Sequence, residues 1–224
     1  NNKNVGLGYD SIKQNVDGEN NVAIGHSALE NGTVSNNIAI GFQAGQTTGT
    51  GDNNTVLGTQ AFRYNETGAN NVVVGYQALA GVNNATVDNV LRSVAIGYQA
   101  LQDNETGTNN VAIGYQAGRN ATGLGNVFIG RQAGQSETNN NRLYIDNSNT
   151  TTPLIYGNFQ TNDIEINGDL KVADQNVFKV GRFTNVQATA LTPANGDMIY
   201  VTSTGGVFTS VGFWGYEAGG WIKL

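Results

Sequence analysis

Residues 109–117 read Asn-Asn-Val-Ala-Ile-Gly-Tyr-Gln-Ala, and variants of this phrase return along the first two thirds of the chain. The glycine of the phrase recurs at intervals of 16, 17 or 22 residues, at Gly8, Gly25, Gly41, Gly58, Gly75, Gly97, Gly114 and Gly130. A ninth, degraded copy places Asp146 where the glycine would stand. Self-similarity at a short period indicates a solenoid, in which each coil buries its apolar side against its neighbours. The repeat therefore predicts a solenoid of about nine coils over residues 1–146.

The three residues before each glycine alternate like a short β-strand. The first and third of them are aliphatic in nearly every copy, so we expect them to share the inward face and to form the core of each coil. This predicted coil core comprises Val22, Ile24, Ile38, Ile40, Leu57, Val72, Val74, Val94, Ile96, Val111, Ile113, Val127 and Ile129.

The middle position of each strand carries an apolar residue and never a charged one. We expect it to face outward, and a second apolar face needs a cover, for which another copy of the chain is the simplest choice. The predicted column at the axis between copies comprises Ala23, Ala39, Val56, Val73, Ala95, Ala112 and Phe128.

After the glycine, most copies carry an aromatic residue, a glutamine and an alanine, which predicts a second short strand in each coil. The glycine between the two strands is expected to form a bend with positive φ. His26, the only histidine, takes the aromatic position, so we interpret it as a ladder member rather than a base or ligand. Paired asparagines precede the first strand and are expected to hydrogen bond along the axis at stacked corners. These pairs are Asn20-Asn21, Asn36-Asn37, Asn53-Asn54, Asn70-Asn71 and Asn109-Asn110.

The phrase at residues 109–117 resembles the YadA-type head repeat of trimeric autotransporter adhesins, which is also found in bacteriophage tail and virion fibres. The shared pattern is an Asn/Ser pair, Val-Ala-Ile-Gly and a small residue a few positions later. The resemblance implies a left-handed parallel β-roll and a homotrimer of three rolls around a common axis. It covers about residues 1–146, and the loops here are longer than in the adhesin heads.

The rest of the chain differs in kind. A polar stretch and two strand-like runs, with an Asn-Gly turn signal at residues 167–168, predict a linker and neck over residues 147–172. Residues 173–224 are expected to form a small antiparallel β module that caps the shaft, trimerises it or forms its tip. Residues 193–201 and 212–224 are similar to short terminal modules of phage fibre and structural proteins.

Composition restricts the function classes. Only 12% of the residues are charged, against about 25% in ordinary domains, and the net charge of −6 comes without a basic cluster, which disfavours nucleic-acid binding. No apolar run approaches the length of a membrane span. The chain has no cysteine, no cofactor motif and no recurring carboxylate pair, so we expect no metal, no cofactor and no enzymatic activity.

Two further features bear on binding. Asn-x-Thr triplets that begin at Asn31, Asn65, Asn104 and Asn120 share one register, with Thr eight residues before the motif glycine, and we interpret them as stacked turns rather than glycosylation sites. The 22-residue interval inserts five residues near 80–92, and insertions in solenoids often carry binding loops. The candidate receptor contacts are therefore Asp88 and Arg92 in this insertion, together with Trp214 and Tyr216 in the aromatic-rich C-terminal module.

These patterns predict a structural fibre or adhesion protein, on a virion or a cell surface. The leading interpretation is a phage tail or virion fibre segment that holds or forms a host-receptor-binding tip. Its expected partners are further copies of the chain, a host glycan or protein receptor, and other fibre or baseplate proteins. The alternatives are a bacterial trimeric adhesin head, which the missing outer-membrane anchor disfavours, the subunit of an extracellular filament, and, more remotely, an ice-binding solenoid. The chain opens inside a repeat without methionine, which indicates a fragment or a processed product.

Overall fold

The computed structural model describes residues 3–15, 17–47, 49, 51–81, 90–104, 106–170, 182–183, 198–201 and 212–224. The chain divides into two compact units, Asn1–Asp169 and Leu170–Leu224. Within the described residues the secondary structure is entirely β, and no helix is present that could cross a membrane.

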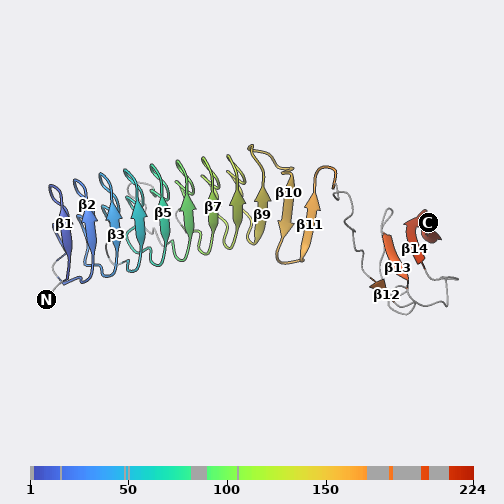
Figure 1. The fold of residues 1–224 in the computed structure, drawn as a ribbon, viewed down its shortest axis with the longest axis horizontal. Coiled ribbons are helices and arrows are strands. Elements are labelled where there is room, and N and C mark those ends of the chain that lie inside the picture. The colour runs from blue at the N-terminus through green and yellow to red at the C-terminus, as the bar shows by residue number, and fades with distance from the viewer. Residues whose placement is uncertain are drawn as a thin grey trace, which may run out of the picture. The chain divides into compact units, whose positions relative to one another are not determined.

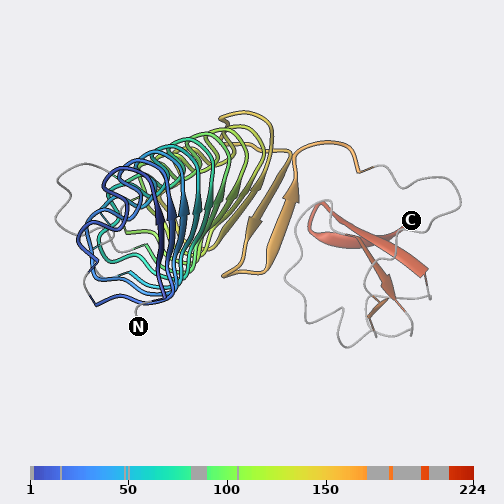
Figure 2. The same ribbon diagram turned by 60° about the vertical axis from the view of Figure 1, so that its left-hand side comes forward.

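The first unit is a parallel β-solenoid of about eight turns, which confirms the predicted fold class (Figure 1). Each turn contributes one three-residue strand, and the strands stack in register in chain order, as Figure 2 shows. The strands are β1 (Val5–Leu7), β2 (Val22–Ile24), β3 (Ile38–Ile40), β4 (Thr55–Leu57), β5 (Val72–Val74), β6 (Val94–Ile96), β7 (Val111–Ile113) and β8 (Val127–Ile129). Equivalent positions of the repeat pair directly, as Ala95 does with Ala112.

The motif glycines stack on one another, with φ between 113° and 142°. This conformation is accessible to glycine alone at low cost, as expected for the bend. A Cβ atom on Gly41 would also lie 2.5 Å from the carbonyl oxygen of Gly58 in the next turn. The glycine is therefore required both by its own backbone angles and by the close approach of the adjacent coil.

The segment after each glycine is a series of turns, so the prediction of a second strand was wrong. Residues two and four places after the glycine have positive φ, as in Gln99 (54°) and Leu101 (51°), and this alternation is incompatible with an extended strand. Hydrogen bonds between coils nevertheless continue through this segment. For example, the N–H of Leu101 donates to the carbonyl oxygen of Ala117 in the next turn. The turns thus stack as regularly as the strands do.

The two faces of the strands are the reverse of the predicted arrangement. The middle column, represented by Ala112, is fully buried inside the coil, where it packs with alanines and with the residues at the fourth turn position, such as Leu101 and Phe62. The flanking residues point outward, and Ile113 is 41% exposed. The predicted coil core was therefore wrong, and so was the assignment of the middle column to an axis between copies. A coil with a single strand has a narrow interior, which admits the small middle residues and excludes two columns of valine and isoleucine.

The second asparagine of each pair forms a buried ladder along the axis. The Oδ1 atom of Asn54 accepts the backbone N–H of Asn71 at 3.0 Å, and its Nδ2 donates across the coil to the carbonyl oxygen of Gly68 at 2.9 Å. Asn37, Asn71, Asn110 and Asn126 repeat this pattern. The first asparagine has positive φ instead, for example 60° at Asn109, which asparagine tolerates better than most residues. The two asparagines of a pair therefore have different structural roles.

A second ladder runs through the side-chain amides of the glutamines. Each Nε2 donates to the Oε1 of the glutamine in the preceding turn at 2.8–3.1 Å. Its members are Gln43, Gln60, Gln77, Gln99, Gln116 and Gln132. All five bonds have the same direction, so each of the four inner amides both donates and accepts without any charged group.

The roll ends in a hairpin instead of a ninth complete turn. Strand β9 (Arg142–Ile145) pairs parallel with β8 and antiparallel with β10 (Ile155–Asn158), which pairs antiparallel with β11 (Asp163–Ile166). The hairpin turn lies at residues 159–162 and not at the Asn-Gly signal, which follows β11. The predicted neck strands thus belong to the same sheet as the shaft.

The second unit contains β12 (Arg182–Phe183), β13 (Met198–Val201), β14 (Gly212–Glu217) and β15 (Gly220–Lys223). These strands form one sheet, in which β13, β14 and β15 are antiparallel and β12 is parallel to β13. The antiparallel β module expected at the C-terminus is therefore present in the described residues.

Candidate functional site

The outward residues of β1–β8 form an apolar surface along the whole roll, which we call the aliphatic face. It consists of the first and third residue of each strand. Its most exposed members, between 36 and 66% accessible, are Val5, Leu7, Ile38, Leu57, Val72, Ile96, Ile113 and Ile129. None of the residues in these eight strands is charged. Isolated exposed aliphatic residues are common, but two uncharged, largely aliphatic columns along eight turns are a candidate interaction surface.

A ladder of rings follows one residue after the motif glycine. His26 stacks between Tyr9 and Phe42, with ring centroids 5.4 and 5.3 Å apart, which confirms its interpretation as a ladder member. Tyr76, Tyr98 and Tyr115 form a second stack with spacings of 5.3 and 5.1 Å. The tyrosine and phenylalanine rings are among the most exposed large side chains of the roll. They extend the apolar surface beyond the glycine column.

The candidate receptor contacts belong to different units of the chain, and each is described within its own unit. Trp214 is 5% exposed on β14, and Tyr216 packs edge-on against Trp221 at 5.3 Å, so both contribute to the packing of the second unit. Arg92 belongs to the roll, where its Nε donates to Asn109 Oδ1 at 2.9 Å. Asp88, with the inserted residues 82–89, lies outside the described part of the chain.

The Asn-x-Thr triplets occupy two different environments. Asn65 and Asn104 are fully buried, and Asn104 Oδ1 accepts the N–H of Gly107 at 2.8 Å, which is the predicted turn. The Nδ2 atom of Asn104 donates to the carbonyl oxygen of Ala121 in the next turn, so this amide is not accessible. Asn31 is half-buried and Asn120 is exposed, because in the shorter coils the triplet begins one position earlier after the glycine.

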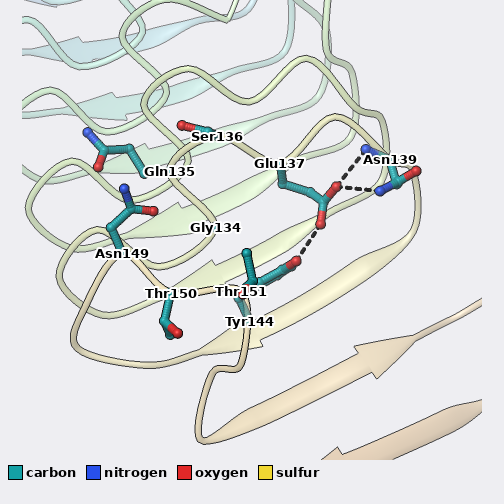
Figure 3. A pocket seen from close by; sticks show the side chains of 9 residues that line it. All are labelled: Gly134, Gln135, Ser136, Glu137, Asn139, Tyr144, Asn149, Thr150 and Thr151. Carbon is teal, nitrogen blue, oxygen red and sulfur yellow. Dashed lines mark hydrogen bonds between the residues drawn. The ribbon is translucent and has the colours of Figure 1, made fainter.

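The last turn of the roll contains a buried acid that sequence reasoning did not identify. Glu137 accepts hydrogen bonds from the backbone and side-chain amides of Asn139 and from the hydroxyl of Tyr144 (Figure 3). Burial alone would raise the pKa of the Glu137 carboxyl, but these hydrogen bonds together outweigh it and lower that pKa below its ordinary value. Burial and the bond to Glu137 raise the pKa of Tyr144. The sequence feature that could have indicated this acid is Tyr144 in the middle column, because a buried tyrosine hydroxyl needs a hydrogen-bond partner.

The described residues contain no group of three or more His, Cys, Asp or Glu side chains that could hold a metal ion. The aliphatic face therefore remains the most extensive candidate for function, and its chemistry suits association with another apolar surface. Comparison of the chain with protein-family models, curated protein sequences and solved structures found no match.

Proposed function

We propose that this protein is a structural, non-catalytic fibre segment, in which the roll associates with further copies of itself through the aliphatic face. The observation that carries the proposal is the uncharged aliphatic face along all eight turns of one chain. Exposed to water, such a surface would promote non-specific aggregation. Covering it lowers the free energy by roughly 25 cal/mol per Å² of apolar area buried.

The size of the surface supports a stable interface. Two columns of eight positions, together with the six rings of the ladder, approach the roughly 20–30 residues that a partner contributes to a standard interface. The absence of charge within β1–β8 agrees with the depletion of charged residues at interface centres. The number of copies, three, follows from the resemblance to the YadA-type head repeat.

In this proposal the trimeric roll is the shaft of an extracellular or virion fibre that holds or forms a host-receptor-binding tip. Its stability would come from stacked coils, supported by the Asn and Gln ladders, and from apolar contacts between chains. A phage fibre and a bacterial adhesin head use such a shaft equally well. Mass spectrometry of purified virions and of cell envelopes would show which particle carries the protein.

The association is tested by light scattering coupled to size-exclusion chromatography. The wild-type protein is expected to have three chain masses, and the double variant Ile96→Lys/Ile113→Lys is expected to be monomeric with an unchanged β-type circular dichroism spectrum. The matched control is Thr106→Lys/Thr122→Lys, which adds the same charge at two exposed polar positions of the same turns. A wild-type mass of one chain would refute the oligomeric shaft.

A further inference from the structure

The C-terminal end of the roll has unused backbone donors. In each of the first seven turns, the N–H groups four and six places after the motif glycine donate to carbonyl oxygens of the next turn, as Gly118 does to Ala133 and Asn120 to Gln135. In the last turn, the equivalent N–H groups belong to Gly134 and Ser136, and they have no acceptor among the described residues. Because no further turn is stacked there, these two donors point where the oxygens of another coil would lie.

A cavity of about 240 Å³ occupies this place. Residues 149–151, in the segment between β9 and β10, also line it. Figure 3 shows the side chains of Gln135 and Asn149 on one side of the cavity and Glu137 with Tyr144 on the other. The remaining polar side chains of the lining are those of Ser136, Asn139, Thr150 and Thr151.

Much of this polar lining has unused hydrogen-bonding capacity. The side chains of Gln135, Ser136, Asn149 and Thr151 make no hydrogen bond to any described residue. Glu137 accepts hydrogen bonds from Asn139 and Tyr144, and its carboxylate forms part of the cavity lining. The cavity thus offers amide, hydroxyl and backbone N–H donors together with a carboxylate acceptor.

This chemistry selects one class of ligand. No Lys, Arg or His lines the cavity, and Glu137 is negative, so a phosphate, sulfate or carboxylate group would be repelled. A single carboxylate that is already hydrogen-bonded is a poor site for a metal ion. The volume is below the roughly 300 Å³ at which pockets for drug-sized ligands begin, and the lining is not the mainly apolar wall that such ligands need.

We propose that the end of the roll is a binding site for one uncharged sugar residue, such as the terminal unit of a surface glycan. The ligand's ring and carbonyl oxygens would accept from the N–H groups of Gly134 and Ser136, in place of the carbonyl oxygens of a further coil. One hydroxyl would donate to Glu137, and others would bond with Gln135 and Asn149. This inference rests on the proposed adhesive function and names the class of receptor that the shaft itself would bind.

The test is saturation-transfer NMR of the full chain with glucose, galactose, mannose, fucose, N-acetylglucosamine and N-acetylgalactosamine, and with N-acetylneuraminic acid and glucose 6-phosphate as charged comparators. At least one neutral sugar is expected to bind with millimolar affinity, and neither charged sugar is expected to bind. The variant Gln135→Ala/Asn149→Ala should weaken binding about tenfold, because it removes two neutral hydrogen bonds.

The matched control is Gln46→Ala/Asn31→Ala, in which Gln46 has the same place in an earlier turn as Gln135. It is expected to bind the sugar as the wild type does. Circular dichroism verifies that both double variants are folded, and light scattering reports the oligomer separately, so loss of binding and loss of assembly are distinguished. Absence of binding by all six neutral sugars at millimolar concentration, preferential binding of a charged sugar, or equal weakening by both double variants would overturn the proposal.

Discussion

A Cβ atom on Gly134 would overlap Cδ1 and Cε1 of the buried Phe128 ring. On the opposite side, a Cβ atom on Gly118 would lie 2.5 Å from Cδ2 of the same ring. At the corresponding place, four residues after the motif glycine, other turns carry a large buried side chain such as Leu101 or Phe62. The one phenylalanine in the middle column of the strands therefore fills the space that two turns leave empty.

Gly134→Ala is expected to destabilise the roll by about 2–4 kcal/mol, because it combines overpacking against Phe128 with a left-handed backbone at φ 56°. In a Phe128→Ala background the steric part should disappear, leaving about 1–2 kcal/mol for the backbone alone. Chemical denaturation of the four proteins of this cycle measures the coupling. Additive effects of the two substitutions would show that the ring and the glycine are independent.

Asn54→Ala is expected to cost more stability than Gln60→Ala, although both residues belong to ladders. Loss of Asn54 leaves the N–H of Asn71 and the carbonyl oxygen of Gly68 buried without partners, at about 1–3 kcal/mol each. Gln60 is partly exposed, so water can replace its bonds to Gln43 and Gln77, and a loss of about 1 kcal/mol is expected. Thermal unfolding of the two variants provides the comparison, and equal shifts would contradict it.

Acidification is expected to loosen the C-terminal end of the roll through Glu137. The pKa of Glu137 is lowered in the folded protein, so its stabilising contribution is complete above the ordinary carboxyl pKa and is lost as pH falls through the folded value. We expect faster hydrogen exchange of the amides around residues 134–145 below about pH 4, under the ordinary pKa of a Glu carboxyl. In Glu137→Gln this additional pH dependence should be absent. If the variant and the wild type respond identically to acid, another group is responsible.

Ala112→Glu and Ile113→Glu are neighbours in sequence but should have opposite consequences. Ala112 is fully buried in the coil, so a glutamate there places an unpaired charge in the interior and is expected to unfold the adjacent turns. Ile113 is on the aliphatic face, so a glutamate there should preserve the coil and prevent association. Hydrogen exchange reports the first effect and light scattering the second. A folded Ala112→Glu protein would show that the middle column is not the coil interior.

Much of the fold could be predicted from the sequence, because stacking forces equivalent residues into identical environments. The period located strands β1–β9, the recurring glycine located a positive-φ bend, and the aromatic column located the ring ladder that includes His26. The asparagine pairs also indicated stacked corners. Each of these features depends on local geometry repeated along one axis, which is what a single sequence contains.

Only the tertiary structure decided which side of each strand is the inside. Alternation identifies residues that share a face. Here both faces are apolar, so the pattern alone does not show which face points into the coil. The width of the coil decides which face is buried. The segment after the glycine forms turns with alternating positive φ, and the resulting interior holds Ala112 but not the neighbouring valine and isoleucine columns. The open end at Gly134 and Ser136 likewise had no signal in the sequence, because a hydrogen-bond donor is unpaired only where the three-dimensional stack stops.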